Sequence, residues 1–513
     1  MNKYLNILLA AGILVPATVS AQNEIDALRF GQTNGAATAR ALGLGGAGGS
    51  YGADFSSLSI NPAGIGVYRK SELMITPSLR FNGTKGTYLN NTVTDNNTKI
   101  NLNNFGVVFS TAPKGKSYQS SAWKAFSIGI GYNRIADFNN RGIYSGLNTE
   151  SSMSEAFAAD AIVNGVGQNM VPPFGYFGYE GYLMDDAGNS IPYENIIRNG
   201  GALEQKKAWE SSGGINEWTL SVGGNYMEKL MLGAAVGLTS YSYDRTNTYS
   251  EDDASGNPNN DFAYFDYNEY LSTTGIGVNV KLGAIYVIDN NFRIGAAFHT
   301  PTWSAFSDIS DYAFTSNTEQ LNGLTNLQPS NEYQFDYSLR TPWRGVLSAT
   351  AFMGRHGFVT ADYEYAAVNS MRYSFANNSF DDYERRVNDA IKETYRGTHN
   401  IRLGVEGRAD KFLGRVGFAY RTSPFNKSEL FDGQRLDLSA GIGLRVKGFF
   451  MDLAYVHTIQ KNAEYGYPLL VESNSGMGIR KIPVGIANIR NGNNMIALTI
   501  GFKFGSNENN NMN

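Results

Sequence analysis

Hydrophobic and polar residues alternate with a period of two along many segments of this chain. In residues 435–446, every second position from Leu436 to Val446 is apolar, and the positions between them are charged, small or glycine. The same pattern recurs at 278–283, 401–406 and 415–421. Such alternation is typical of β-strands, whose successive side chains point to opposite faces. One face therefore suits lipid and the other suits water.

The connections between these strands alternate between short and long. Short connections follow Met227, Val287, Met353, Arg408 and Val446. Long polar connections cover residues 139–214, 245–272, 301–331, 367–397 and 461–492. Outer-membrane barrels show this asymmetry, with tight periplasmic turns and long extracellular loops. We therefore predict an all-β fold: a 14-stranded antiparallel transmembrane β-barrel over residues 71–504.

The eighth predicted strand, residues 332–353, contains the dipeptide Thr341-Pro342. Proline cannot donate to a strand ladder, so it marks either a turn or a kink. A turn would make the number of strands odd and leave the C-terminus on the wrong side, so we expect a kinked strand. The last strand is followed by a polar tail, residues 505–513.

The N-terminus has the pattern of a secretory signal peptide, residues 1–21. Lys3 precedes an apolar run that ends before Pro16, and Val19-Ser20-Ala21 supplies a small-residue cleavage site. The run is too short for a membrane anchor. The chain has no cysteine, and its net charge of -4 gives no reason to expect nucleic-acid binding. We expect an exported protein of the bacterial cell outer membrane.

Residues 22–70 precede the first strand and are predicted to form a plug, or hatch, inside the lumen. A 14-stranded barrel is too wide to be filled by its own side chains. The segment is rich in glycine at 40–49 and ends in the turn Asn61, Pro62, Ala63 and Gly64, which we interpret as a gating hinge. The alternative is a flexible linker, which would not need the apolar residues spaced through this segment.

On these residues the chain resembles the FadL/TodX family of outer-membrane transporters for long-chain fatty acids and hydrocarbons. The likeness rests on residues 41–47, on Asp54 with residues 57–64, and on the late strand pair 402–406 and 415–420. The resemblance implies a monomeric barrel with a hatch and passive uptake of a hydrophobic small-molecule ligand. It also implies contact with membrane lipid and lipopolysaccharide, and with the barrel-assembly machinery during biogenesis.

The same resemblance implies a sideways exit, because in that family ligand leaves beside a kink in the third strand. The matching segment, residues 129–138, contains the possible lateral-opening residues Gly131, Asn133, Arg134 and Asp137. Its second half lacks glycine. A lateral gap is therefore an expectation that the sequence alone does not establish.

One predicted loop, residues 171–184, is unusually aromatic for a segment that faces water. Exposed apolar clusters usually mark a binding site or a membrane contact. We expect ligand capture by Phe174, Tyr176, Phe177, Tyr179, Tyr182 and Leu183. A second loop has a helical stripe from Phe380 to Tyr395, capped by Ser379. We expect this stripe to pack onto the rim, and the alternative is an apolar landing groove for ligand.

The ionisable residues give no sign of catalysis or of a bound cofactor. Lumen-facing cations such as Lys281, Arg402 and Arg415 have carboxylates near them, so we expect structural charge ladders. The four histidines are far apart in the sequence, and we predict no metal site, no cofactor and no enzyme activity. The alternatives that stay open are a non-transport barrel (an adhesin, a structural protein or a phospholipase-like enzyme), a nonspecific porin and a haemin receptor.

Overall fold

The computed structural model describes residues 24–33, 37–113, 115–164, 174–186, 193–195, 202–258, 260–319, 322–328, 332–426, 432–472 and 479–505. The predicted signal peptide and residues 506–513 of the predicted tail lie outside these ranges. Among the described residues, none of the helices combines the length and the hydropathy needed to span a membrane.

The strands close into one antiparallel barrel of 14 strands, because the last of them pairs with the first. In chain order they are β1 (Ser71–Tyr88), β2 (Asn91–Thr111), β3 (Trp123–Asp137), β7 (Leu203–Tyr226), β8 (Leu230–Asp253), β9 (Tyr264–Val287), β10 (Phe292–His299) with β11 (Trp303–Asn317), β13 (Tyr333–Arg340) with β14 (Arg344–Phe352), β15 (Gly357–Ala366), β17 (Thr398–Ala409), β18 (Phe412–Arg421), β19 (Arg435–Val446), β20 (Phe449–Glu472) and β21 (Ile479–Phe504). The predicted fold class is confirmed.

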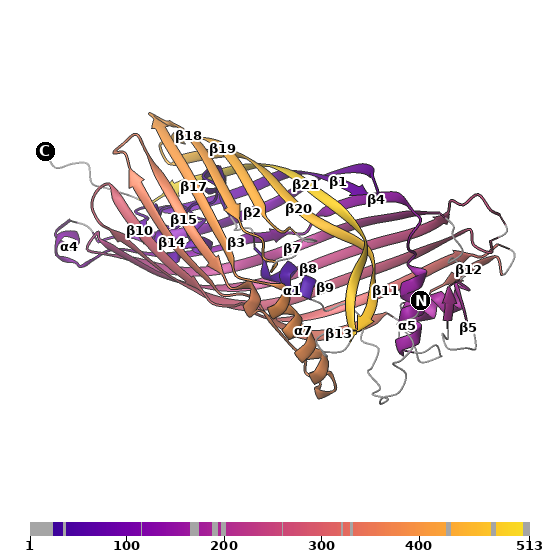
Figure 1. Ribbon diagram of the computed structural model, residues 1–513. Coiled ribbons are helices and arrows are strands. Elements are labelled where there is room, and N and C mark those ends of the chain that lie inside the picture. The colour runs from indigo at the N-terminus through magenta and orange to yellow at the C-terminus, as the bar shows by residue number, and fades with distance from the viewer. Residues whose placement is uncertain are drawn as a thin grey trace.

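The remaining described elements lie inside the barrel, at its two ends and beside β13. They are α1 (Glu24–Gly31), α2 (Ala39–Gly43), α3 (Ser57–Ile60), η1 (Pro62–Val67), α4 (Gly115–Ser120), β4 (Asn140–Asn148), α5 (Ser154–Asn164), α6 (Phe174–Glu180), β5 (Met184–Asp186), β6 (Tyr193–Asn195), β12 (Leu324–Leu327), η3 (Val368–Ser370), β16 (Arg372–Ser374), η4 (Asn378–Phe380) and α7 (Asp381–Thr394). Figure 1 shows α4 and the C-terminus at one end, which we call the short-turn end, and α5, β5 and β12 at the other, the long-loop end.

Two neighbouring strands are broken at the same level by proline. Pro301 separates β10 from β11, and Pro342 separates β13 from β14. The two breaks are joined by hydrogen bonds from Thr341 N to Thr302 O (3.0 Å) and from Thr302 N to Thr341 Oγ1 (2.9 Å). The expected kink in the eighth strand is therefore confirmed, and the matching kink in the seventh strand was not predicted.

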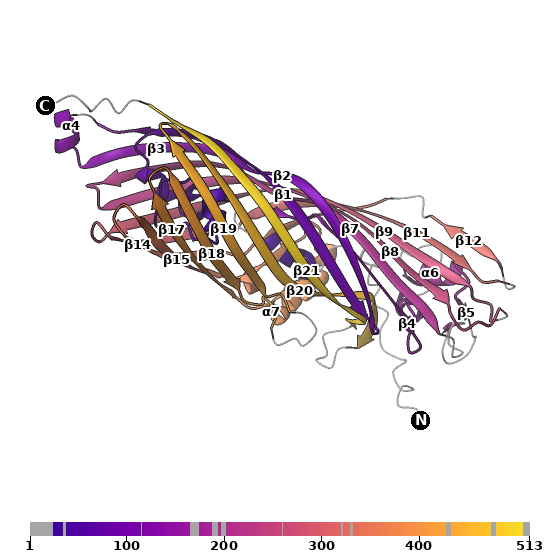
Figure 2. The same cartoon turned by 90° about the horizontal axis from the view of Figure 1, so that it is seen from above.

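Several segments that we predicted as long loops are parts of strands, so these predictions are wrong. β11 fills much of the predicted loop 301–331, and β20 and β21 form a ladder through most of 461–492. In Figure 2, β7, β8, β9 and β11 run well beyond the shorter strands β14 to β19. The outer faces of these strands become polar beyond the apolar band. The amino-acid composition of the strand ends therefore resembles that of a loop. The alternation of inward and outward side chains nevertheless persists.

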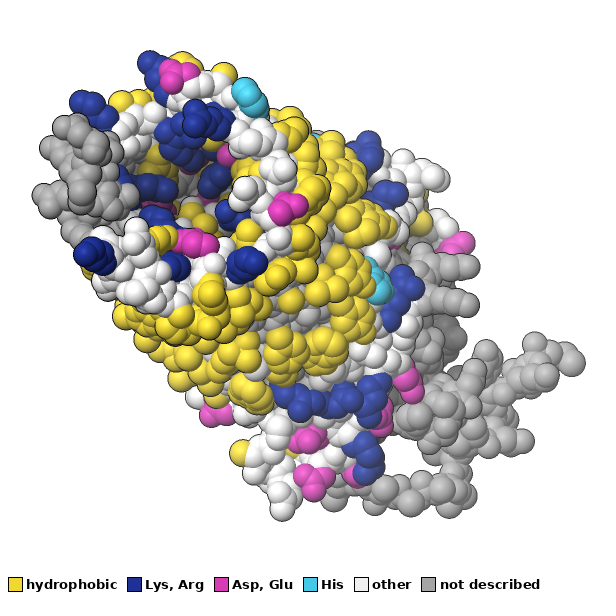
Figure 3. Space-filling view, turned by 90° about the vertical axis from the view of Figure 1, so that its left-hand side faces the viewer, with side chains coloured by type: hydrophobic (Ala, Val, Ile, Leu, Met, Phe, Trp, Pro, Cys, Tyr) yellow, Lys and Arg dark blue, Asp and Glu magenta, His cyan; other side chains and the backbone are white. Residues whose placement is uncertain are grey.

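The outer wall carries a continuous apolar band, which Figure 3 shows around the short-turn mouth. Large side chains exposed on it include Leu73, Ile75, Ile130, Leu220, Leu238, Leu347, Val416, Ile442, Leu453 and Phe502. Their inward neighbours are polar, small or buried, and Figure 3 shows charged side chains inside the mouth. A closed wall with such a band is the surface of a transmembrane β-barrel.

Candidate functional site

The N-terminal segment, residues 24–67, lies inside the barrel and contacts the wall on several sides. Its end, with the predicted hinge residues Asn61, Pro62, Ala63 and Gly64, is buried. Asn61 caps η1, because its Oδ1 accepts a hydrogen bond from Ala63 N (3.1 Å). Its Nδ2 donates to Gly49 O (2.7 Å) and to Ala284 O of β9 (3.3 Å). The turn is therefore a packed anchor in this conformation.

Inward-facing glycines of the wall make room for this anchor. A Cβ at Gly283 of β9 would fall far inside van der Waals contact with Asn61 Oδ1, and one at Gly233 of β8 would collide with Pro62. On β18, a Cβ at Gly417 would collide with the backbone of Gly45. The glycine positions that we assigned to a water-facing surface are thus contact surfaces for the N-terminal segment.

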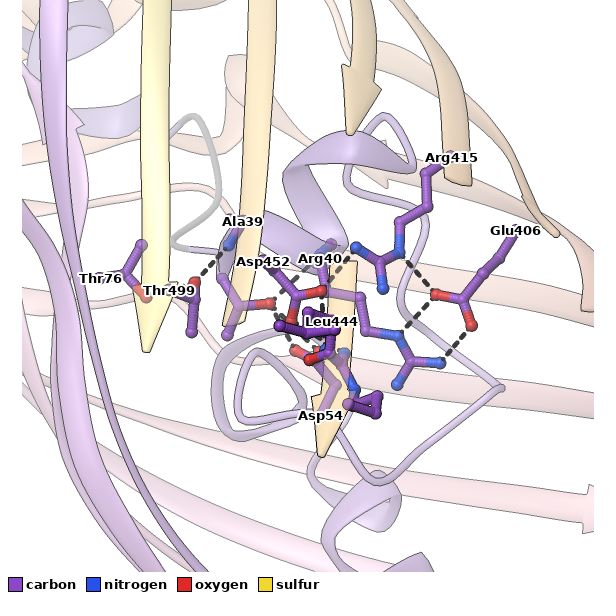
Figure 4. A network of polar contacts seen from close by, with 12 residues as sticks. Ala39, Arg40, Asp54, Thr76, Glu406, Arg415, Leu444, Asp452 and Thr499 are labelled. Atoms are coloured by element: carbon purple, nitrogen blue, oxygen red, sulfur yellow. Dashed lines mark hydrogen bonds and ion pairs between the residues drawn. The ribbon is translucent and has the colours of Figure 1, made fainter. Parts of the chain in front are cut away.

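An ionic network fixes α2 to the wall, as Figure 4 shows. Arg40 makes two bonds to Glu406 (2.9 Å each), and Glu406 also accepts from Arg415 Nε (2.6 Å). Arg415 reaches Asp452 (2.7 Å), which also accepts from Arg445 (2.9 and 3.0 Å). Burial would lower the pKa of Arg40, but Glu406 outweighs it and holds that pKa well above its ordinary value.

Three further contacts hold the loop between α2 and α3. Asp362 of β15 accepts hydrogen bonds from the backbone N–H groups of Gly48 (2.9 Å) and Gly49 (3.0 Å). The hydroxyl groups of Ser50 and Thr350 lie 2.7 Å apart. Residues 38–67 therefore form a docked unit, held by backbone contacts, buried charges and the shape of the wall.

Helix α1 docks differently, in an aromatic chamber nearer the long-loop end. Phe30 packs against Phe306, Phe138, Tyr241 and Tyr243, with ring centroids 4.9 to 6.2 Å apart. The other buried members of this cluster include Tyr337, Leu339, Met371, Tyr373, Val387, Ile391 and Tyr395. The apolar stripe of α7 belongs to it, so the expected rim packing is confirmed, although Asn377, not Ser379, caps the start of this helical region.

A polar chamber lies between the aromatic cluster and the docked unit. Three carboxylates line it: Glu217, Glu364 and Asp437. The cationic side chains in the lining are more numerous, seven in all: Arg80, Arg134, Lys281, Arg344, Arg402, Arg421 and Arg435. Several of these form ion pairs, such as Lys281 with Glu217 and Arg402 with Glu364 (2.7 Å). The expected charge ladders are therefore present, and the described lining keeps an excess of cations.

The polar chamber is small, and Thr33 and Ala37 from the N-terminal segment form part of its lining. Its volume is about 160 Å³, below the roughly 300–1,000 Å³ of most small-molecule pockets. Arg344 donates to Gly31 O (2.9 Å) and to the Thr33 hydroxyl, so the C-terminal end of α1 covers one side.

The wall has an interrupted ladder between β2 and β3. Backbone pairing runs from Thr111 with Phe126 to Asn104 with Asn133 and ends there. Beyond that point β2 still pairs with β1, whereas β3 and then β4 pair with β7. Among the described residues, no ladder joins β2 to β4, so the backbone pairing of the wall is interrupted between these two strands; we call this interruption the slit.

Side chains bridge the slit where the backbone does not. Asn101 Nδ2 donates to Asp137 (2.7 Å), which also accepts from Arg134 Nε (3.1 Å). Nearer the long-loop end, Arg141 makes two bonds of 2.7 Å to Asp95. Asn91 of β2 also donates to Ser145 O of β4 (3.1 Å), so bonds made by side chains close the slit in place of a ladder.

All four predicted lateral-opening residues lie at or beside this interruption. Asn133 is the last paired residue, Arg134 borders a bulge against β7, and Asp137 bridges the slit. Gly131 faces inward against Phe55 of the N-terminal segment. The buried side-chain amide of Asn104 has no hydrogen-bond partner among the described residues. Phe138, which follows Asp137, contacts Phe30 of α1, so the slit adjoins the aromatic chamber.

The predicted ligand-capture residues fall into two groups. Phe177 and Leu183 are buried in a second aromatic cluster beneath α5 and α6. Tyr179 and Tyr182 are 42% and 44% exposed at the long-loop end. Tyr176 is half-buried, and the side chain of Phe174 is not among the described side chains. Phe177 and Leu183 thus belong to an interior core, while Tyr179 and Tyr182 remain accessible at the long-loop end.

Within the described ranges, no group of three or more His, Asp or Glu side chains is arranged to hold a metal ion. His299 is inside the barrel, with Nε2 3.0 Å from Ile60 O, and His399 bonds the Tyr363 hydroxyl (2.7 Å) on the outer wall. Sequence reasoning missed Phe30 and Asp362, which join the N-terminal segment to the wall. The inward glycines opposite this segment were the available signal.

These features define a class: a transmembrane β-barrel whose lumen is occupied by its own N-terminal segment. No protein-family model and no curated protein matches the sequence. Among solved structures, the fold is similar to that of a Pseudomonas aeruginosa FadL homologue, at 12% identity and a TM-score of 0.52, covering 92% of this chain and 99% of that one. This likeness shows a shared fold.

Two toluene transporters also align over most of their length. The Pseudomonas putida protein TodX is 11% identical, with a TM-score of 0.49, 92% of this chain and 99% of that chain covered. The Ralstonia pickettii protein TbuX is 12% identical, with a TM-score of 0.48, 92% of this chain and 100% of that chain covered.

Proposed function

We propose that this protein takes up hydrophobic small molecules passively across the bacterial outer membrane. The short turns then face the periplasm and the long-loop end faces outward. The observation that carries the proposal is the aromatic chamber, which holds the replaceable helix α1 and adjoins a slit in the wall. A dry pocket with a side exit offers apolar molecules a route past the charged lipopolysaccharide layer.

The chambers favour a ligand with an apolar chain and an anionic head, such as a long-chain fatty acid. The chain matches the rings around Phe30, and the carboxylate matches the cation-rich polar chamber next to it. A neutral hydrocarbon would leave these cations without a new partner.

The path of the ligand follows from the contacts in the barrel that a ligand can replace. Tyr179 and Tyr182 meet the ligand at the long-loop end, and the ligand then displaces α1 from the aromatic chamber. It leaves through the slit once the bridge between Asn101 and Asp137 opens. Residues 38–67 stay docked, with Asn61-Pro62 as the fixed end of the hinge, so the hatch rearrangement is confined to α1 and its connection.

A labelled long-chain fatty acid tests the function in a strain lacking the gene, with and without the protein restored, and in liposomes. Because the chain has no cysteine, a single engineered disulfide can lock the docked unit. Ser50→Cys with Thr350→Cys is suitable, since the two hydroxyl groups are 2.7 Å apart. We expect oxidised and reduced protein to take up fatty acid at rates within about twofold.

Other outcomes would replace the proposal or part of it. Loss of uptake in the oxidised pair would show that the ligand passes beneath the docked unit. Uptake that does not depend on the protein would exclude this cargo. Large, stable ion conductance of the unlocked wild type would indicate a porin, although the N-terminal segment packed in the lumen argues against an open pore.

A further inference from the structure

Two arginines face each other on the outside of the barrel, near the long-loop end. Arg340 ends β13 and Arg372 begins β16, and the two are directly opposite in the ladder. Their neighbours Leu339 and Tyr373 are buried in the interior cluster, so both arginines point outward. Like charges directly opposite in a sheet repel each other. An anion bound between them would remove this repulsion.

The protein supplies these two guanidinium groups with backbone acceptors. Arg372 Nη1 donates to Met371 O (2.7 Å), and Arg340 Nη2 lies 3.5 Å from Ser370 O. Among the described residues, neither arginine has a carboxylate within ion-pair distance, and Asp389 is paired with Lys392 (3.0 Å). Each guanidinium has five N–H donors, so most of them remain available on the outer side.

A row of residues across the strands places this pair at the edge of the apolar band. The register joins Leu238 to Val278, Val278 to Trp303, Trp303 to Arg340, and Arg340 to Arg372. Neighbouring strands are about 4.8 Å apart and barrel strands tilt by roughly 40°. Each step to the next strand therefore moves the row by about 3 Å along the barrel axis. The row begins among exposed apolar side chains and ends at the two arginines.

Aromatic rings mark the boundary just below the arginines. Trp303 is 52% exposed, directly opposite Arg340. Trp343 stacks between Phe298 and Tyr365, with centroids 6.0 and 5.5 Å away. Tryptophan and tyrosine gather at the level of lipid head groups in membrane barrels. The arginine pair thus lies at the depth where lipid phosphates are found.

We propose that Arg340 and Arg372 bind the phosphate of an outer-leaflet glycolipid head group, with an acyl chain of the same lipid lying over Trp303. The phosphate oxygens accept hydrogen bonds from both guanidinium groups, which removes the repulsion between them. The site rests on the membrane orientation given under Proposed function. It does not depend on what the lumen transports.

The test measures lipid binding to the full-length protein in detergent by native mass spectrometry. The probes are phosphorylated lipid A, its dephosphorylated form and inorganic phosphate. We expect wild type to bind phosphorylated lipid A at least about tenfold more tightly than the dephosphorylated form, which corresponds to 1.4 kcal/mol. The double variant Arg340→Gln/Arg372→Gln should lose this preference. Arg385→Gln/Arg386→Gln, with the same charge change on exposed α7, should keep it.

Heat-modified electrophoretic mobility checks that each variant is a folded barrel. Equal binding of both lipid A forms by folded wild type would overturn the proposal, as would a control pair that loses the preference too. Inorganic phosphate that competes fully at equal concentration would identify a free-anion site instead. Fatty-acid uptake should be the same in wild type and Arg340→Gln/Arg372→Gln, so a failure of the transport proposal and a failure of this site are distinguishable.

Discussion

The two parts of the N-terminal segment are held in the lumen by different kinds of contact. Residues 38–67 are fixed through backbone hydrogen bonds, buried ion pairs and close approach to wall glycines such as Gly283. Helix α1 is held mainly by side-chain packing, with Phe30 among four other rings and Arg29 over the ring of Tyr243 (4.2 Å). Single hydrogen bonds from Tyr395 to Glu24 O and from Arg344 to Gly31 O (2.9 Å each) add to this packing. A ligand can reproduce the second kind of contact but not the first. The comparison therefore separates a fixed unit from a replaceable one.

The largest effect is expected from Gly283→Ala. The new Cβ would collide with Asn61 Oδ1. The Asn61 side chain must therefore move away and lose its hydrogen bonds to Ala63, Gly49 and Ala284, which weakens the anchor of the docked unit. Overpacking of this kind costs about 1–3 kcal/mol of unfolding free energy. We expect a many-fold rise in ion conductance across planar bilayers. Gly414→Ala is the matched control, because no atom lies near its added Cβ; equal conductance of the two variants would contradict a close-fitting anchor.

Arg40→Gln should weaken the docked unit without removing it. The change breaks two charged hydrogen bonds to Glu406, which keeps Arg415 as a partner. Hydrogen bonds to charged groups contribute about 1.5–3 kcal/mol. Amide hydrogen exchange in α2 should therefore become roughly 10- to 100-fold faster. The exposed pair Arg385 and Asp382 provides the control, because Arg385→Gln should leave the rate of amide exchange in α2 unchanged. An unchanged rate in Arg40→Gln would show that the ionic network is dispensable.

Phe30→Ala should strengthen ligand binding if α1 competes for the aromatic chamber. A buried phenylalanine replaced by alanine costs about 3–5 kcal/mol, so α1 becomes easier to displace. We expect fatty-acid affinity to rise by about tenfold or more in equilibrium binding. Phe265→Ala opens a similar space in the second aromatic cluster and should have no such effect. A lower affinity in Phe30→Ala would mean that Phe30 contacts the ligand itself.

The smallest effect is expected from Asp137→Asn, which keeps the side-chain shape but removes the charge that bridges the slit. Its bonds to Asn101 and Arg134 weaken by about 1 kcal/mol. Uptake of labelled fatty acid should become about two- to fivefold faster, because the slit opens more often. Asp336→Asn, an exposed carboxylate on β13, is the control. A slower rate in Asp137→Asn would place the exit elsewhere.

Much of the barrel could be predicted from the sequence because strand alternation is a local property. The short turns, the number of strands and the kink at Pro342 all follow from neighbouring residues. The strands beyond the apolar band were misjudged as loops, since their outward faces are polar there. Gly131, Asn133, Arg134 and Asp137 were located by resemblance, but only the ladder register shows where pairing between β2 and β3 ends.

By itself, the sequence determined which residues face lipid, since period-two hydrophobicity needs no partner strand to be recognised. Only the tertiary structure decided what the opposite face contacts. An inward glycine such as Gly283 or Gly417 can face water or lie against the backbone of another segment. Which of the two it does depends on residues more than 200 positions away. The outward pair Arg340 and Arg372 likewise became visible only in the ladder, because cross-strand neighbours are set by register and not by sequence distance.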